Sequence, residues 1–328
     1  MSRILVTGGA GYIGSHTVKM LLGAGHHVVV LDNLSYGHRA AVPEASLIVA
    51  DLRDVDHLDQ ILVAHRIDSV IHFAASTFVG ESVSDPAKYY LNNLVHSANL
   101  LERVRRHGIS KFVFSSTCAT YGVPAKSPIT EAAPQHPINP YGNTKLAFER
   151  MLADFAKPYG IGYAALRYFN ASGAAPDGSI GEDHTPETHL IPLVIQAALG
   201  QRPHIEIYGT DYPTPDGTCI RDYIHVDDLA AAHVHALDRI EPGVGRCLNV
   251  GTGRGYSVRE VIRTVEEVSG RKVPTKEGPR RAGDPPELVA AADAIRRDLN
   301  WEPKYTELRT IVETAWNWHR NKPRGYGK

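Results

Sequence analysis

The sequence predicts a doubly wound α/β fold, in which a parallel sheet is covered by helices on both faces. Short apolar runs alternate with stretches of helical period through the first half of the chain. Because these runs are apolar throughout, both faces of each strand should be buried, as is typical of a parallel sheet. The expected strands are residues 4–6, 28–31, 47–49, 69–73, 112–114 and 163–166.

The second half of the chain changes character and predicts a smaller, discontinuous lobe. Residues 171–217 are rich in Pro, Gly, His and Asp, which suggests structure built around a ligand. We expect a cofactor-binding domain at 1–170 with a return segment at about 220–251, and a substrate lobe at 171–219 and 252–328. The expected elements are strands at 205–208 and 220–226 and helices at 191–199, 226–237, 257–269 and 305–320.

Composition and charge exclude several classes of protein. Of the 328 residues, 43% are hydrophobic, enough for a full core, and the formal net charge is −1. A charge near zero gives no electrostatic attraction for nucleic acid or an anionic membrane, so we expect neither as a partner. No apolar stretch is long enough to span a membrane, and the N-terminus does not resemble a signal peptide.

The cysteines and histidines suggest neither disulfides nor a metal site. Cys118, Cys219 and Cys247 have no metal-ligand spacing and no even-numbered framework, which indicates a reducing compartment, so we expect a cytoplasmic protein. His233 and His235 lie on an expected helix without a carboxylate or cysteine at ligand spacing. We therefore expect no metal.

A glycine-rich motif follows the first expected strand. Its glycines recur at every third position, and a helix-forming run at 15–22 comes next. Glycine permits a tight turn and close approach of the backbone to a pyrophosphate, which then lies at the positive end of the helix. The motif predicts a dinucleotide cofactor. The residues expected beside it are Gly8, Gly11, Tyr12, Ile13 and Gly14.

A carboxylate at the end of the second expected strand favours NAD over NADP. Asp32 lies eighteen residues after Gly14, where it can accept hydrogen bonds from the adenosine ribose and repel a 2′-phosphate. Arg39 keeps NADP as the alternative. The other residues expected near the cofactor are Asn33, Asp51 and Leu52 after the second and third strands, and Phe73, Ala74 and Ala75 after the fourth.

Tyr141 and Lys145 are the residues expected to carry the chemistry. Four residues apart, they lie on one face of a helix, and Pro140 suits the first turn of that helix. Lowering a Tyr pKa from about 10 to about 7 needs roughly 4 kcal/mol of stabilisation of the phenolate. A fixed Lys cation and a positive nicotinamide can supply that in a shielded cleft. The pair therefore predicts an acid–base catalyst.

Further motifs are spread from Arg3 to Gly325. They include Phe114-Ser-Ser-Thr117, Arg167-Tyr-Phe-Asn170 and residues 6–16, 32–34, 72–74, 80–82, 89–93, 140–141, 221–226 and 280–284. In these motifs the chain resembles the extended short-chain dehydrogenase/reductase superfamily, and most closely its UDP-glucose 4-epimerase family. The resemblance implies a Rossmann-type fold, NAD that stays bound, and reversible inversion at C4 of a UDP-linked hexose through a 4-keto sugar.

The resemblance also implies the catalytic roles. Thr117 matches the hydroxyl residue that bonds the reacting oxygen, and Tyr141 the base that removes the C4 hydroxyl proton. Lys145 would hold the nicotinamide ribose and lower the pKa of Tyr141. Further cofactor contacts are expected at Asn92, Ser115 and Phe169.

The substrate contacts follow from the same resemblance. Arg221 and Arg281 correspond to pyrophosphate ligands, a task that suits the guanidinium fork. The others are Asn170 at a phosphate, Leu190 and Tyr208 along the uracil, Asp284 at the ribose and Leu288 as gatekeeper of the sugar pocket. The chain departs from some members at Thr77, where a Lys can reach the cofactor, and at His189, where an Asn lies near the sugar.

Three alternative functions share this scaffold. UDP-pentose and UDP-uronate 4-epimerases use the same chemistry and differ only in the contacts to C6. A sugar-nucleotide 4,6-dehydratase is the second alternative. The pattern of that class has an Asp–Glu pair directly after the Thr, at the positions that Cys118 and Ala119 occupy in this chain. A non-catalytic NAD-sensing regulator would not need the intact Thr117, Tyr141 and Lys145.

We also expect a homodimer. Apolar stripes lie on the expected helix at 89–106 and on the helix that begins near Tyr141, and in related enzymes these helices pair with their copies in a four-helix bundle. The alternative is that both stripes pack on the sheet. The first stripe consists of Leu94, Ala98, Leu101 and Arg105, and the second consists of Phe148, Leu152 and Phe155.

Overall fold

The computed structural model describes residues 1–281 and 283–327, and its main feature is a seven-stranded sheet. The strands lie in the order β10-β6-β5-β4-β1-β2-β3, and every neighbouring pair is parallel. The predicted doubly wound parallel sheet is confirmed. Its strands are β1 (Arg3–Thr7), β2 (His27–Asp32), β3 (Leu47–Val49), β4 (Ser69–His72), β5 (Lys111–Thr117), β6 (Gly162–Tyr168) and β10 (Gly245–Val250).

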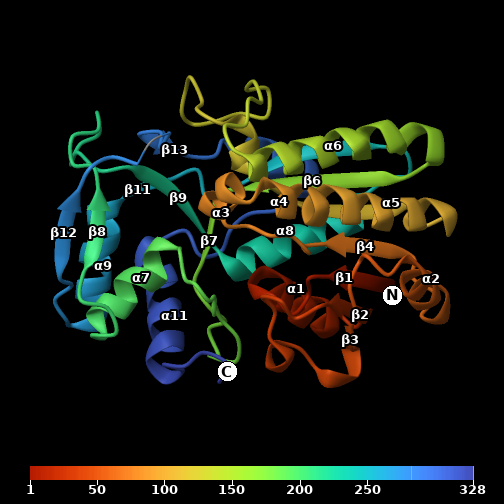
Figure 1. Cartoon of the computed structure of the whole chain (residues 1–328), viewed down its shortest axis with the longest axis horizontal. Helices are drawn as coiled ribbons and strands as arrows, with labels where there is room; N and C mark the ends of the chain where they lie inside the picture. The colour runs from red at the N-terminus through yellow and green to blue at the C-terminus, as the bar shows by residue number, and fades with distance from the viewer. Residues whose placement is uncertain (282, 328) are drawn as a thin grey trace.

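Helices cover both faces of this sheet (Figure 1). Apolar side chains of α1, α8 and α10 pack on one face, and those of α2, α5 and α6 on the other. Among the described residues, no helix combines the length and apolar character needed to cross a membrane. The helices are α1 (Tyr12–Gly23), α2 (Val55–Ala64), α3 (Val79–Ser84), α4 (Pro86–Tyr89), α5 (His96–Arg106), α6 (Pro140–Tyr159), α7 (Leu190–Ala198), α8 (Val226–Arg239), α9 (Val258–Ser269), α10 (Asp293–Leu299) and α11 (Leu308–Asn321).

The strand β10 is missing from the sequence prediction. It is an edge strand, paired only with β6 in the described sheet, and its first half is partly exposed. Polar side chains at Arg246 and Asn249 interrupt the apolar pattern that marked the other strands. An edge position tolerates the partly exposed Arg246, because one side of the strand is not enclosed by neighbours. Asn249 is completely buried, where it accepts from the Tyr121 hydroxyl and donates to the Ile129 carbonyl.

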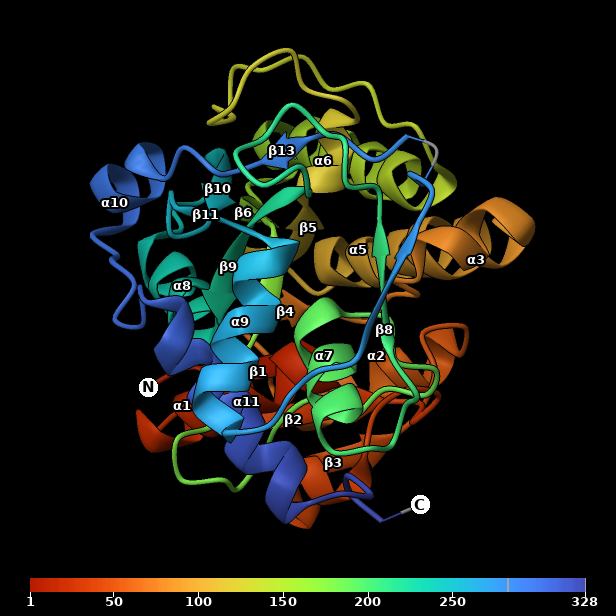
Figure 2. The ribbon, with the colours of Figure 1, turned by 90° about the vertical axis from the view of Figure 1, so that its left-hand side faces the viewer.

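The remaining strands form two smaller sheets. β9 pairs in parallel with β7 and β13 and antiparallel with β11, so it does not extend the large sheet. The helices α7, α9 and α11 enclose a separate apolar core beside these strands (Figure 2). The proposed domain boundaries stay a prediction. The strands are β7 (Asn170–Ser172), β8 (Ile205–Tyr208), β9 (Ile220–His225), β11 (Gly255–Ser257), β12 (Thr275–Gly278) and β13 (Glu287–Leu288), with β12 paired to β8.

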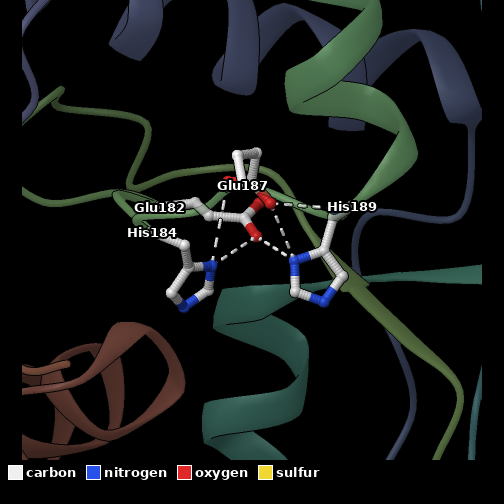
Figure 3. Close-up of side chains that lie close together, drawn as sticks. All are labelled: Glu182, His184, Glu187 and His189. Carbon is white, nitrogen blue, oxygen red and sulfur yellow. Dashed lines mark hydrogen bonds and ion pairs between the residues drawn. The ribbon is translucent and has the colours of Figure 1, made fainter. Parts of the chain in front are cut away.

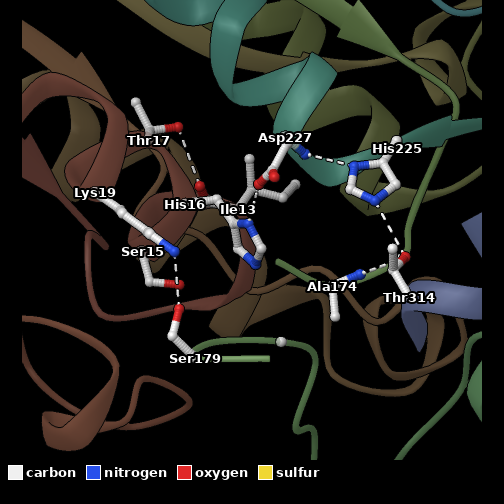
Figure 4. A network of polar contacts seen from close by, with 12 residues as sticks. Ile13, Ser15, His16, Thr17, Lys19, Ala174, Ser179, His225, Asp227 and Thr314 are labelled. Carbon is white, nitrogen blue, oxygen red and sulfur yellow. Dashed lines mark hydrogen bonds and ion pairs between the residues drawn. The ribbon is translucent and has the colours of Figure 1, made fainter. Parts of the chain in front are cut away.

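A chain of polar contacts ties α1 to the C-terminal elements (Figure 4). The His16 ring lies 2.5 Å from the Asp227 carboxylate, and the Asp227 backbone N–H donates to the His225 ring at 3.1 Å. The other nitrogen of His225 contacts the Thr314 hydroxyl at 3.1 Å. These contacts join α1 to the start of α8, to the end of β9 and to α11.

The helix expected at 89–106 is interrupted. A π-helical turn, Tyr90–Val95, separates α4 from α5. Within it the amide of Asn93 is buried and both accepts from and donates to the Ser76 backbone, each at 2.8 Å. A π-turn inside a helix is often found at a functional site. Here it holds residues 92 and 93 against the segment that follows β4.

Three residues of the apolar stripes predicted for a dimer interface are core residues, and the other four are partly buried. Leu101, Phe148 and Leu152 are completely buried and pack against the sheet. Leu94 and Phe155 are partly buried against the same cluster. Helical periodicity cannot tell a face that meets the sheet from one that meets a second molecule, because both are apolar.

Candidate active site

The glycine-rich loop is shaped by close backbone contacts. Gly8 has a φ of 70°, and a Cβ there would lie 2.5 Å from the Ala74 nitrogen. A Cβ at Gly14 would lie 2.3 Å from the Gly8 carbonyl oxygen. Gly11 precedes α1 and has no side chain to accept hydrogen bonds from the first N–H groups of that helix. These groups are therefore free for an anion, which fits the pyrophosphate of a dinucleotide.

Asp32 lies at the end of β2, beside this loop. Its buried carboxylate accepts hydrogen bonds from the Ala10 N–H at 2.9 Å and from the Leu34 N–H at 2.8 Å. Burial raises the pKa of Asp32, and these two bonds oppose the rise. Each carboxylate oxygen keeps a further lone pair, as a ribose hydroxyl requires. The Asn33 amide donates to Asp51 at 2.8 Å, so the ends of β2 and β3 meet as predicted.

The other predicted cofactor residues lie along the ends of the neighbouring strands. Phe73 and Ala74 donate their N–H groups to the Thr7 carbonyl at 2.9 and 3.1 Å, which holds the end of β4 beside the glycine loop. The Asn92 amide lies 3.4 Å from the Ser76 hydroxyl. Leu52 is buried after β3, and the Ser115 hydroxyl is hydrogen-bonded to Tyr168.

The predicted catalytic residues meet where β5 ends and α6 begins. The Asn139 side chain caps α6 by accepting from the Gly142 N–H at 2.8 Å, and Pro140 occupies the first turn, as predicted. Tyr141 and Lys145 are both buried, and the Lys145 ammonium donates to the Ser115 carbonyl at 2.8 Å. Thr117 is the last residue of β5, and its hydroxyl lies near enough to Tyr141 to lower the pKa of that phenol.

The protein's own groups do not lower the pKa of Tyr141 as the sequence analysis expected. Burial raises that pKa far above its ordinary value, Tyr168 raises it further, and only the Thr117 hydroxyl opposes the rise among the main causes. The Lys145 ammonium is directed at the Ser115 carbonyl and lies 5.9 Å from the centre of the Tyr141 ring. Burial also lowers the pKa of Lys145, to about 7.

A buried ion pair behind the catalytic residues was missed by the sequence analysis. The Arg167 guanidinium donates to both oxygens of Glu149, with the shortest contact at 2.6 Å, and to the Tyr121 hydroxyl at 2.9 Å. The Ser116 hydroxyl also donates to Glu149. A charged residue four positions after Lys145, on the face of a helix that packs on the sheet, is the signal that could have revealed it. The pair ties α6 to β6, and the Ser116 contact ties α6 to β5 next to Thr117.

Four predicted substrate residues gather in the smaller lobe. The Asp284 carboxylate lies 3.5 Å from Arg221 and 3.2 Å from Arg281. The Arg281 guanidinium lies over the Tyr208 ring at 4.7 Å. The Arg281 side chain is 65% exposed, so it can turn toward a ligand, whereas Arg221 is held by the Ile220 and Pro285 carbonyls.

The other predicted substrate residues lie on β13, β7 and α7. Leu288 in β13 pairs with Arg221 in β9, and its side chain packs on the cluster that contains Phe169 and Tyr121. Asn170 donates to the Asp222 carbonyl at 2.9 Å. Leu190 is the first residue of α7. Phe169 is buried, in agreement with a packing role.

This arrangement agrees with the comparison to known proteins. Residues 4–251 match the model of the NAD dependent epimerase/dehydratase family. The chain belongs to this family. A UDP-glucose 4-epimerase of Halalkalibacterium halodurans is 53% identical over 324 residues, which are 98% of this chain and 97% of that protein.

Solved structures of family members have the same fold. A crystal structure of a UDP-glucose 4-epimerase matches with a TM-score of 0.96 and 49% identity, covering 99% of both chains. A UDP-glucose 4-epimerase from Brucella ovis in complex with NAD matches with a TM-score of 0.93 and 51% identity, covering 96% of this chain and 98% of that one. The resemblance to the 4-epimerases noted in the sequence is confirmed, and the chain is an NAD-dependent enzyme.

Replacing Thr117 with alanine should reduce turnover, whereas replacing it with serine should have a mild effect. The Thr117 hydroxyl lowers the pKa of Tyr141 and also accepts from the Ala119 N–H at 3.1 Å. Serine keeps this hydroxyl and removes only a methyl group. Steady-state kinetics of both variants will separate the two effects. Equal losses in the two variants would mean that the methyl group, and not the hydroxyl, matters.

Proposed function

We propose that this chain interconverts UDP-glucose and UDP-galactose by inverting C4 through a transient 4-keto sugar. The observation that carries the proposal is the meeting of Thr117, Tyr141 and Lys145 where β5 ends, at the same edge of the parallel sheet as the glycine-rich loop that follows β1. In the smaller lobe, Arg221, Asp284 and Arg281 form a polar set suited to a nucleoside diphosphate. Relatives at about half identity over the whole chain carry the same activity in their names.

The residues of the chain have separate tasks in this reaction. Tyr141 accepts the proton of the C4 hydroxyl and returns it to that same oxygen after the 4-keto sugar has turned over in the site, and Thr117 orients that oxygen. Lys145, held by the Ser115 carbonyl, positions the cofactor ribose. Bound NAD supplies the hydride acceptor. Asp32 and residues 8–14 hold its adenosine half, while Arg281 and Arg221 hold the substrate diphosphate.

The test is turnover of UDP-galactose by the purified full-length chain. We expect formation of UDP-glucose without added cofactor and without net release of NADH, because the hydride must return to the same sugar. NAD should be recovered from the denatured protein. Activity only with added NADP, or one NADH released in each turnover, would contradict the proposal.

The alternatives differ in what they require of the site. A 4,6-dehydratase needs an acid and a base after Thr117, but burial raises the pKa of the Cys118 thiol to about 12, and Ala119 cannot ionise. UDP-pentose and UDP-uronate substrates would use the same catalytic residues. Assays with these sugars beside UDP-galactose will rank the substrates by kcat/KM.

The size of residue 288 should control the tolerance for a 2-N-acetyl group. Leu288 packs beside Phe169 and leaves more room than a tyrosine would. We expect the native enzyme to act on UDP-galactose and to show measurable activity on UDP-N-acetylgalactosamine. Leu288→Tyr should lower the second activity relative to the first. An unchanged ratio of kcat/KM values, or a native enzyme inactive on the N-acetyl sugar, would contradict this role.

We also propose that the enzyme is a cytoplasmic homodimer that acts in galactose metabolism. All three cysteines are free thiols, which suits a reducing compartment. Apolar side chains remain exposed along the π-turn and α6, with Leu91 at 55%, Val95 at 47% and Tyr159 at 51%. Sedimentation at micromolar concentration should give the mass of two chains, and Leu91→Asp with Val95→Asp should give one. A monomeric native mass would contradict the dimer.

A further inference from the structure

Two glutamates and two histidines converge in the segment that leads into α7. They are Glu182, His184, Glu187 and His189, here called the 182–189 cluster, and one ligand atom of each lies within 4.8 Å of the others. Figure 3 shows the Nδ1 atoms of both imidazoles directed at the carboxylates. The Glu182 oxygen lies 2.6 Å from His189 Nδ1 and 3.2 Å from His184 Nδ1. The Glu187 oxygens lie 3.2 and 3.8 Å from the same two nitrogens.

These separations suit a four-coordinate ion. Tetrahedral zinc with bonds of about 2.0–2.1 Å to nitrogen and oxygen places its ligand atoms roughly 3.3 Å apart. The four distances between imidazole nitrogen and carboxylate oxygen in the cluster, from 2.6 to 3.8 Å, lie on both sides of that value. Two imidazoles and two carboxylates also form a set that first-row divalent ions accept, and two carboxylate charges balance one divalent cation.

A second observation is that the atoms facing the centre of the cluster are buried. His189 Nδ1 is enclosed and lies 2.6 Å from Glu182 and 3.2 Å from Glu187, at angles that do not form a hydrogen bond. The side chain of Glu182 is only 3% exposed and that of Glu187 only 6%. Buried carboxylates need a cationic partner.

We propose that the 182–189 cluster binds one divalent transition-metal ion, with zinc as the ion that best fits the ligands. All four ligand positions come from the protein, so the site is structural and not catalytic. The His189 side chain is 43% exposed, which provides a path for the ion to enter.

The place of the cluster in the fold indicates what the ion does. His189 caps α7, and Leu190 is the first residue of that helix. His184 contacts the edge of the Tyr12 ring in the glycine-rich loop, with ring centres 6.1 Å apart. An ion here joins the cofactor loop to the start of the substrate lobe. The ion should therefore stabilise the contact between the start of α1 and the segment that leads into α7, without taking part in proton transfer.

The competing explanation is a cluster of ion pairs in which the imidazoles are protonated. Such a cluster needs no metal, so metal content separates the two. The tag-free, full-length chain should be purified with zinc in the medium and dialysed, and its metal measured by elemental analysis. We expect about one zinc per chain in the native protein, and none in His184→Gln with His189→Gln. The matched control is His235→Gln, because His235 lies on the exposed face of α8. This variant should keep its zinc.

Two further measurements complete the test. Zinc added to chelator-treated protein should raise the thermal midpoint by roughly 3 °C or more at about 100 times its Kd, and it should not affect the double variant. Cobalt in place of zinc should give the visible absorption of a four-coordinate site. A native chain with no more metal than the double variant and no shift with zinc would overturn the proposal. None of these readouts depends on epimerase turnover, so the proposed function is tested separately.

Discussion

Replacing Tyr141 with phenylalanine should reduce epimerase turnover by roughly 10³-fold or more while the protein stays folded. General acid–base catalysis contributes about 10²–10⁴-fold, and Tyr141 is the ionisable group next to Thr117, in the first turn of α6. The ring of Tyr141 stays in place in the variant, so its packing is preserved. Burial opposes ionisation of this phenol, and the substitution removes only the group that must ionise.

The Tyr141→Phe experiment has a matched control within the chain. Tyr212 is also a buried tyrosine, and its hydroxyl makes no hydrogen bond among the described residues. Tyr212→Phe should therefore keep near-native turnover. Both variants should be compared by steady-state kinetics and by NAD content. Substantial turnover in Tyr141→Phe with normal NAD content would show that another group is the base.

Replacing Arg167 with methionine should lower the free energy of unfolding by about 3–5 kcal/mol. That is the typical cost of removing one partner of a buried ion pair, because the other charge is left without compensation. The side chains of Arg167 and Glu149 are only 5% and 3% exposed. In the variant, the Glu149 carboxylate would keep its contacts with Ser116 and Gln135 but no cation.

A second variant and a control make this result specific. Arg167→Met with Glu149→Leu should be more stable than Arg167→Met alone, because the uncompensated charge is gone. Arg254→Ala breaks a pair with Glu307 whose side chains are 58% and 63% exposed, and such pairs contribute only about 0–1 kcal/mol. Denaturant unfolding at a fixed NAD concentration is the measurement. Equal losses in Arg167→Met and Arg254→Ala would mean that burial does not strengthen the inner pair.

The local sequence was sufficient to predict the large sheet and the cofactor loop. Strands buried on both faces are apolar throughout, so their positions along the chain could be predicted, except for that of the edge strand β10. The glycines between Gly8 and Gly14 are required by backbone contacts with near neighbours in sequence or with the adjoining strand. Pro140 and Tyr141 begin their helix as predicted, because the capping signals are local.

Tertiary structure alone decided which charged and apolar side chains meet. Leu101, Phe148 and Leu152 of the stripes assigned to a dimer are core residues, and β9 belongs to a small sheet, because periodicity describes a face but not its partner. Burial raises the pKa of Tyr141, and both this burial and the direction of Lys145 depend on β5 and α6 together. Glu149 meets Arg167, and Glu182 meets His189, only when distant or irregular segments fold against each other. Electrostatic energies depend on separation and burial, which the order of residues along a chain does not specify.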